Sequence, residues 1–82
     1  MNVIISYDIR DEKRIQKVAK YLEGVSIRLQ YSVFMLINPK KDELKKIVSE
    51  VIKLIEKEDS IKVYKFNIKY AIANYDIKHF II

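Results

Sequence analysis

Hydrophobic and polar residues alternate along this chain with two periods, and each period predicts one kind of element. Residues 3–7 form an uninterrupted β-branched and aromatic run, which predicts a strand buried on both faces. From Ile15 onward, apolar residues recur at the i, i+3, i+4, i+7 spacing of an amphipathic helix. This helix is expected over residues 12–23, between an N-cap at Asp11 and a left-handed C-terminal cap at Gly24.

Residues 27–37 alternate with a period of two, which predicts extended chain. The predicted core face carries apolar side chains at every second position: Ile27, Leu29, Tyr31, Val33 and Met35. The opposite face begins polar at Arg28 and ends apolar at Leu36, a pattern that suits contact with another molecule. Because few strands are this long, we expect a break or tight turn within the stretch.

A second helix is predicted to start at Asn38-Pro39, since proline after a capping residue favours the first helical turn. Its apolar stripe begins at Leu44 and ends at Ile55, and Asp59-Ser60 is expected to end the helix. Residues 61–66 then alternate as a strand. The predicted order is therefore strand, helix, one or two strands, helix and strand.

This order indicates an α+β fold, a ferredoxin-like βαββαβ sandwich in which two helices cover one face of an antiparallel sheet. Residues 1–82 are expected to form one domain. Residues 70–73 and 77–82 are further extended candidates, and the chain ends in the unusually apolar His79-Phe80-Ile81-Ile82. We therefore predict an extra C-terminal strand, about residues 70–82, that pairs with the sheet edge of a second protomer.

Composition narrows the classes of protein to which this chain can belong. Half of the 82 residues are hydrophobic, and glycine and proline occur once each, which argues against disorder. The absence of cysteine excludes disulfides, and His79 as the single histidine leaves no zinc site. No signal peptide or bilayer-spanning run is visible, so the sequence predicts a soluble cytoplasmic protein. The net charge of +5 is compatible with a polyanionic partner.

Candidate chemistry gathers in the first third of the chain. Asp8 ends the first predicted strand, and the three arginines, Arg10, Arg14 and Arg28, are its neighbours in sequence. A carboxylate at the end of a buried strand needs a cationic partner or a metal, unless it starts the turn or caps the next helix. Both interpretations of Asp8 stay open. Arginine binds phosphate bidentately, whereas the thirteen lysines along the rest of the chain mostly solvate helix faces.

Several motifs occur together in order: Tyr7-Asp8-Ile9, Asp11-Glu12-Lys13-Arg14 with Lys17-Val18-Ala19, Arg28-Leu29-Gln30-Tyr31-Ser32-Val33-Phe34, and Ile61-Lys62-Val63-Tyr64. With this spacing, over almost the whole chain, the sequence resembles the CRISPR-associated protein Cas2 family. The resemblance implies a ferredoxin-like homodimer whose C-terminal strands extend the partner's sheet. It also implies that residues 27–37 are divided into two strands.

For function, the resemblance implies a metal-dependent endonuclease for single-stranded RNA or double-stranded DNA, with Mg²⁺ or another divalent cation as cofactor. It also implies a part in spacer acquisition beside Cas1, the larger integrase. Residues that match the family's active cleft are Asp8, which is also the metal ligand, Tyr7, Arg28, Ser32 and Phe34. Expected nucleic-acid contacts are Arg10, Lys13, Arg14, Lys17 and Arg28. Two positions depart from the family pattern, because Ile15 replaces a frequent arginine and Met35 a frequent glutamate.

One aspartate is too few for a firm Mg²⁺ site, but a two-fold dimer would supply two copies of Asp8. Two other functions stay open: a non-catalytic dimeric adaptor that binds duplex DNA, and a toxin-like ribonuclease of the same fold. An RNA-recognition module is disfavoured because no predicted strand contains glycine. Tyr31 and Phe34 are interpreted as core or dimer contacts rather than base-stacking platforms, and Arg28 alternatively as an interface ion-pair partner.

Overall fold

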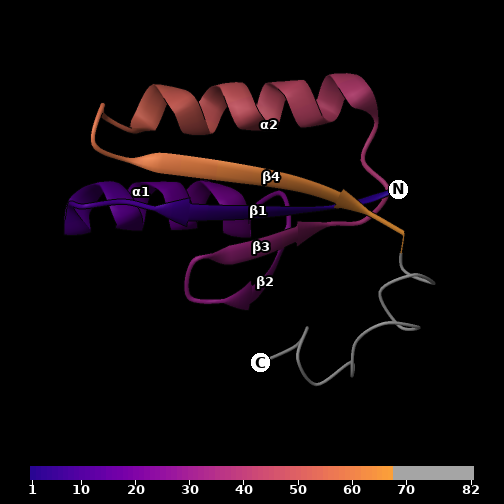
Figure 1. Ribbon diagram of the computed structural model, residues 1–82, viewed down its shortest axis with the longest axis horizontal. Coiled ribbons are helices and arrows are strands. Elements are labelled where there is room, and N and C mark those ends of the chain that lie inside the picture. The colour runs from indigo at the N-terminus through magenta and orange to yellow at the C-terminus, as the bar shows by residue number, and fades with distance from the viewer. Residues whose placement is uncertain (68–82) are drawn as a thin grey trace.

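The computed structural model describes residues 1–67, which form six elements (Figure 1). In chain order these are β1 (Asn2–Asp8), α1 (Glu12–Glu23), β2 (Ile27–Gln30), β3 (Val33–Leu36), α2 (Lys41–Leu54) and β4 (Ser60–Phe66). The extended candidates at residues 70–73 and 77–82, with their pairing to a second protomer, lie outside the described residues.

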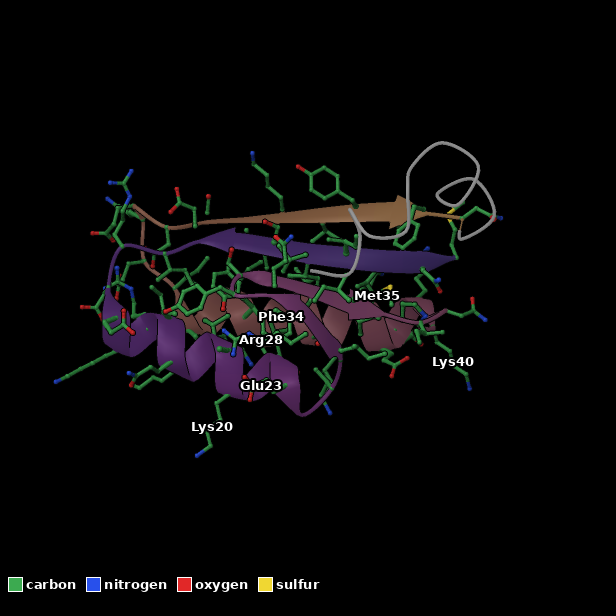
Figure 2. The ribbon with its side chains drawn as sticks, turned by 90° about the horizontal axis from the view of Figure 1, so that it is seen from below. Lys20, Glu23, Arg28, Phe34, Met35 and Lys40 are labelled. Atoms are coloured by element: carbon green, nitrogen blue, oxygen red, sulfur yellow. The ribbon has the colours of Figure 1, made fainter. Side chains whose placement is uncertain are left out.

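The four strands form one antiparallel sheet in the order β2-β3-β1-β4. Both helices lie on the same side of this sheet, below the strands in the view of Figure 2. The βαββαβ order and the strand order together confirm the predicted ferredoxin-like α+β fold. Neither helix of the described part of the chain is long and apolar enough to cross a membrane.

Along β1, buried side chains alternate with partly covered ones. Val3, Ile5 and Tyr7 are buried beneath the helices, whereas Ile4 and Ser6, on the other face, are only partly covered. The predicted burial of this strand on both faces is therefore wrong for the described part of the chain. The reason is the layering: both helices lie on one side, and no other element of residues 1–67 packs on the second face of the sheet.

The predicted break in residues 27–37 is confirmed, since a turn at Tyr31-Ser32 separates β2 from β3. The predicted core face is wrong. Phe34 is fully buried and Leu36 nearly so, whereas Ile27 and Tyr31 are exposed. The register decides this: Phe34 lies opposite Ile5 and Leu36 opposite Val3, so both point toward the helices with the buried side of β1.

α1 occupies the predicted residues, and the Asp11 carboxylate caps it by accepting a hydrogen bond from the Arg14 N–H at 3.0 Å. Gly24 does not adopt the expected left-handed cap, because its φ of −78° is right-handed. Its N–H continues the helix by donating to the Tyr21 carbonyl at 3.1 Å. No positive φ is needed here.

The ends of α2 differ from the prediction. Asn38 is left-handed, with φ 45°, and Pro39 precedes the helix, which begins at Lys41. The Lys40 N–H donates to Glu43 Oε1 at 3.2 Å and so closes the first turn. At the other end, α2 stops at Leu54, before the predicted Asp59-Ser60.

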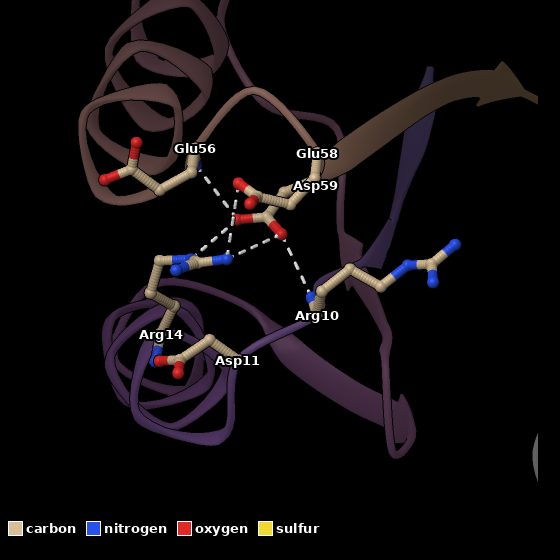
Figure 3. A network of polar contacts seen from close by, with 6 residues as sticks. All are labelled: Arg10, Asp11, Arg14, Glu56, Glu58 and Asp59. Atoms are coloured by element: carbon tan, nitrogen blue, oxygen red, sulfur yellow. Dashed lines mark hydrogen bonds and ion pairs between the residues drawn. The ribbon is translucent and has the colours of Figure 1, made fainter.

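Asp59 instead anchors the turn between α2 and β4 (Figure 3). Its buried carboxylate accepts hydrogen bonds from Arg14 Nε at 2.8 Å, from Arg14 Nη2 at 3.1 Å, and from the backbone N–H groups of Arg10 and Glu56. Hydrogen bonds from the Arg14 guanidinium hold the pKa of Asp59 well below its usual range, although burial opposes the shift. The network joins the loop after β1 to the start of β4.

We predict that Asp59→Asn lowers the Tm at neutral pH, because it leaves the guanidinium of Arg14 without its main anion. A depressed folded-state pKa stabilises the protein above the unfolded-state value of about 3.9, and this stabilisation is lost as the pH falls below it. The variant should therefore lose less stability than wild type between neutral and acidic pH.

Thermal unfolding of both proteins across the acidic range checks this. Glu58→Gln is the matched control, since Glu58 is 59% exposed and lies 3.6 Å from Arg14, an arrangement that contributes little. An Asp59→Asn protein with the Tm and pH profile of wild type would contradict the role given to the network.

Candidate functional site

An aromatic and polar cluster joins the end of β1 to the turn between β2 and β3. The Tyr7 ring stacks on Phe34, with 6.1 Å between centroids and 23° between planes. The Tyr7 N–H donates to the Ser32 carbonyl at 3.2 Å and its hydroxyl donates to the Tyr31 carbonyl at 3.3 Å. Burial raises the pKa of the Tyr7 phenol, so near neutral pH this group is a proton donor and not a base.

Arg28 completes the cluster from β2, and Figure 2 shows it between Glu23 and Phe34. Its guanidinium donates to Glu23 Oε1 at 2.5 Å and to the Tyr31 carbonyl at 2.6 Å. The guanidinium carbon lies 5.3 Å from the ring centroids of both Tyr31 and Phe34, within cation–π range. Of the predicted site residues, the structure thus brings together Tyr7, Arg28, Phe34 and the backbone of Ser32.

Asp8 lies apart from this cluster. It is exposed at the last position of β1, and alternation turns its side chain to the sheet face opposite the Tyr7 ring. In register it faces Ser60 of β4, and a shallow pocket of about 130 Å³ is lined by Ser6, Tyr7, Asp8, Ser60 and Lys62. The predicted catalytic set is therefore divided between the two faces of one sheet.

The donors at this pocket fit a divalent cation only in part. They comprise one carboxylate and the hydroxyls of Ser6 and Ser60, beside the ammonium of Lys62. Within residues 1–67, no three acidic or histidine side chains come close enough together to hold a metal ion. Mg²⁺ is usually held by one or two carboxylates with waters and phosphate oxygens, so this chain alone supplies the minimum set.

The cations expected to contact nucleic acid fall into two groups. Arg14 and Arg28 are each paired with a carboxylate of the same chain, at 2.8 Å and 2.5 Å. The Arg10 guanidinium points away from the Asp59 network (Figure 3), and Lys13 and Lys17 are exposed on α1. A phosphate backbone can therefore reach these three cations without displacing a carboxylate.

The sequence analysis did not identify three residues as parts of these arrangements: Asp59, Ser60 and Lys62. Lys62 and Ser60 join the Asp8 pocket only because β4 pairs with β1, and that register cannot be read from either strand alone. Asp59 reaches Arg14 across 45 positions of sequence. No local pattern signals such a long-range pair, whereas Asp11 before an apolar stripe of helical spacing did predict a helix start.

Comparison with known proteins gives a consistent result. Residues 1–78 match the family model described as CRISPR associated protein Cas2. Over 62 residues the chain is 37% identical to CRISPR-associated endoribonuclease Cas2 2 of Thermodesulfovibrio yellowstonii, covering 74% of this chain and 67% of that protein. It is 38% identical over 68 residues to CRISPR-associated endoribonuclease Cas2 3 of Chloroflexus aurantiacus, covering 82% and 72% respectively. A Nitrosomonas europaea relative of the same description, 39% identical, is matched over 58% of its length.

Solved structures agree. Streptococcus pyogenes Cas2 at pH 6.5 superposes with a TM-score of 0.77 at 27% identity, covering 93% of this chain and 98% of that one. A chain of the partial Cas6-RT-Cas1–Cas2 complex reaches a TM-score of 0.80 at 23% identity, covering 94% and 84%. At 23% identity, the similarity to the chain of this complex shows a shared fold alone.

The cluster yields a prediction about Arg28→Lys. Lysine keeps the charge but cannot reproduce the planar contacts of Arg28 with Glu23, the Tyr31 carbonyl and the two rings. We expect amide hydrogen exchange in the turn between β2 and β3 to accelerate by about tenfold, since a charge-assisted hydrogen bond contributes about 1.5 kcal/mol. Arg10→Lys, at a guanidinium directed away from the network, should leave exchange unchanged. Unaltered exchange in Arg28→Lys would show that the turn does not depend on the guanidinium.

Proposed function

The chain belongs to the CRISPR-associated protein Cas2 family, and from this premise we propose that it is a metal-dependent endonuclease that takes part in spacer acquisition. The main support for this proposal is that residues 1–78 match the family model. The relatives described as endoribonucleases support RNA as one substrate, with double-stranded DNA as the other candidate. We also propose that the protein works in the cytoplasm.

We propose further that the working unit is a homodimer. The face of the sheet opposite the helices supports this, because within residues 1–67 it carries the half-buried Ile4, Val33 and Met35 beside the exposed Tyr64. Met35, Ile4 and Tyr64 are cross-strand partners in register, and Val33 lies two positions before Met35 on β3, opposite Ser6, so the four form an apolar strip. Asp8 lies on the same face, at the end of β1. A two-fold axis over this face would bring two Asp8 carboxylates toward each other.

In this proposal the two Asp8 carboxylates hold Mg²⁺ or another divalent cation, which supplies Lewis acidity toward the phosphate. Asp8 is exposed, so its carboxylate binds a cation without first leaving a protein partner. Ser60 and Ser6 provide neutral oxygens beside it, and Lys62 provides a positive charge for the phosphate. A supporting role is assigned to Tyr7, Arg28 and Phe34, which hold Ser32 and its turn beside the end of β1.

Nucleic acid binding is assigned to Arg10, Lys13 and Lys17, which are exposed. Arg14, although it belongs to the same segment, is bound to Asp59, and its first effect is on the fold. The cations available for a phosphate backbone therefore lie along the start of α1 and the loop before it. Binding by such a surface depends on charge and not on base sequence.

A second function is supported by one observation, the single carboxylate that each protomer offers at the Asp8 pocket. If two copies of Asp8 do not meet, the chain is a non-catalytic dimer that binds duplex DNA and joins Cas1 in spacer integration. A structure of similar fold comes from a complex that contains Cas1 and Cas2. The two functions make opposite predictions for Asp8.

We predict that Asp8→Asn reduces Mg²⁺-dependent cleavage of labelled single-stranded RNA or duplex DNA by at least about 100-fold, because the metal's contribution to catalysis amounts to several kcal/mol. Binding of duplex DNA should be retained. Asp42→Asn, at an exposed position of α2, is the control and should cleave like wild type. Equal cleavage by Asp8→Asn would refute the metal site, and no cleavage by wild type would favour the adaptor.

For the binding surface, we predict that the double variant Lys13→Gln/Lys17→Gln weakens duplex binding and reduces its salt dependence. Each phosphate contact contributes about 0.9 to the slope of log K against log salt, so the slope should decrease by up to about 1.8. Lys45→Gln/Lys46→Gln removes the same charge from α2. If this control lowers the slope equally, the effect is one of net charge and the surface is wrongly assigned.

A further inference from the structure

One large aromatic side chain has no role in the functions described above. Tyr31 stands at the turn between β2 and β3 with 63% of its surface exposed, although it belongs to an otherwise well-packed aromatic cluster. We propose that the Tyr31 ring, supported by Arg28, is a stacking platform for one unpaired nucleobase. This proposal rests on the nucleic-acid function proposed above and names which part of the polymer the site takes.

The backbone beneath the ring is fixed in advance. The Tyr31 carbonyl accepts hydrogen bonds from the Tyr7 hydroxyl at 3.3 Å and from Arg28 Nη2 at 2.6 Å. The first donor comes from a buried strand, and the second is itself held by Glu23. A ligand that binds the ring therefore has little ordering of the turn to bring about, which favours affinity.

The side chains form a continuous series of contacts from the core to the surface. Tyr7 stacks on Phe34, the Arg28 guanidinium lies 5.3 Å from the Phe34 centroid, and it lies 5.3 Å from the Tyr31 centroid as well. Planar groups thus follow one another, and the exposed ring of Tyr31 ends the series. A ligand that extends this series is therefore expected to be another planar π-system.

Charge favours a base over a phosphate at this place. The positive charge of Arg28 is offset by Glu23 at 2.5 Å, so the turn offers no uncompensated cation to a phosphate. An aromatic ring beside a guanidinium instead suits the flat face of a base, and such stacking tolerates any base. In a duplex both faces of a base are already stacked, so only an unpaired base can use the platform.

Position links the platform to the candidate cleavage site. The Tyr7 N–H binds the Ser32 carbonyl, so the turn lies at the end of the sheet where β1 ends in Asp8 (Figure 1). A strand with one base on Tyr31 would run past this end of the sheet. The platform therefore selects an unpaired stretch, in RNA or in DNA, near the carboxylate.

The test measures binding without Mg²⁺, so that cleavage does not interfere. Fluorescence anisotropy with labelled single-stranded RNA, single-stranded DNA and a blunt duplex compares wild type, Tyr31→Ala and Tyr31→Phe. We expect Tyr31→Ala to weaken binding of single strands by about 5- to 100-fold, the range for loss of one stacked base, and Tyr31→Phe to stay within about twofold. Blunt duplex binding should be unchanged in both. Ile52→Ala, at an exposed hydrophobic residue of α2, is the control.

A single strand that carries 2-aminopurine gives a second measurement that needs no alanine variant: stacking should quench its fluorescence on wild type and on Tyr31→Phe.

The proposal is overturned if Tyr31→Ala binds single strands as wild type does, if it weakens single strands and duplex equally, or if it changes only the oligomeric state. Equal losses for RNA and DNA mean that the unpaired base alone is recognised. If wild type binds duplex but not single strands, this proposal fails while the proposed function stands.

Discussion

The constraint on which the site depends is that both helices lie on one face of the sheet. Because strand side chains alternate, β1 then sends Tyr7 into the helix-covered core and Asp8, its neighbour in sequence, to the uncovered face. One side of the sheet holds a packed aromatic cluster, and the other presents a carboxylate beside an apolar strip. Adjacent residues therefore lie in different surroundings: Tyr7 is hydrogen-bonded to the turn between β2 and β3, and Asp8, the proposed metal ligand, is exposed.

The arginines show how the same side chain is put to structural or binding use. Arg14 neutralises the buried carboxylate of Asp59, and this pair holds the α2–β4 turn against the loop that follows Asp8. Arg28 spans Glu23 and the Tyr31 carbonyl, where its charge is compensated. Only Arg10 of the three directs its guanidinium away from these carboxylates within the described residues. Proximity of the arginines in sequence thus gave no sign that two of them are paired with carboxylates of the same chain.

The order of the elements, and with it the ferredoxin-like fold, could be predicted from the sequence, and so could several local features. The bounds of α1 and its cap at Asp11 follow from helical spacing and capping chemistry, and the break within residues 27–37 follows from strand length. The inward face of that segment did not follow, because alternation identifies two faces without saying which one is covered. Pairing of Phe34 on β3 with Ile5 on β1 decided it. The Asp59–Arg14 pair was likewise hidden, since it joins distant segments.

The proposed cation site requires the Asp8 carboxylates of two chains. The stoichiometry of Mn²⁺ binding, measured by electron paramagnetic resonance titration alongside sedimentation of the same sample, tests this requirement. We expect one ion for every two chains in a dimeric protein, with the site lost in Asp8→Asn. One ion per chain, or binding that survives the substitution, would show that the two copies of Asp8 do not share a cation.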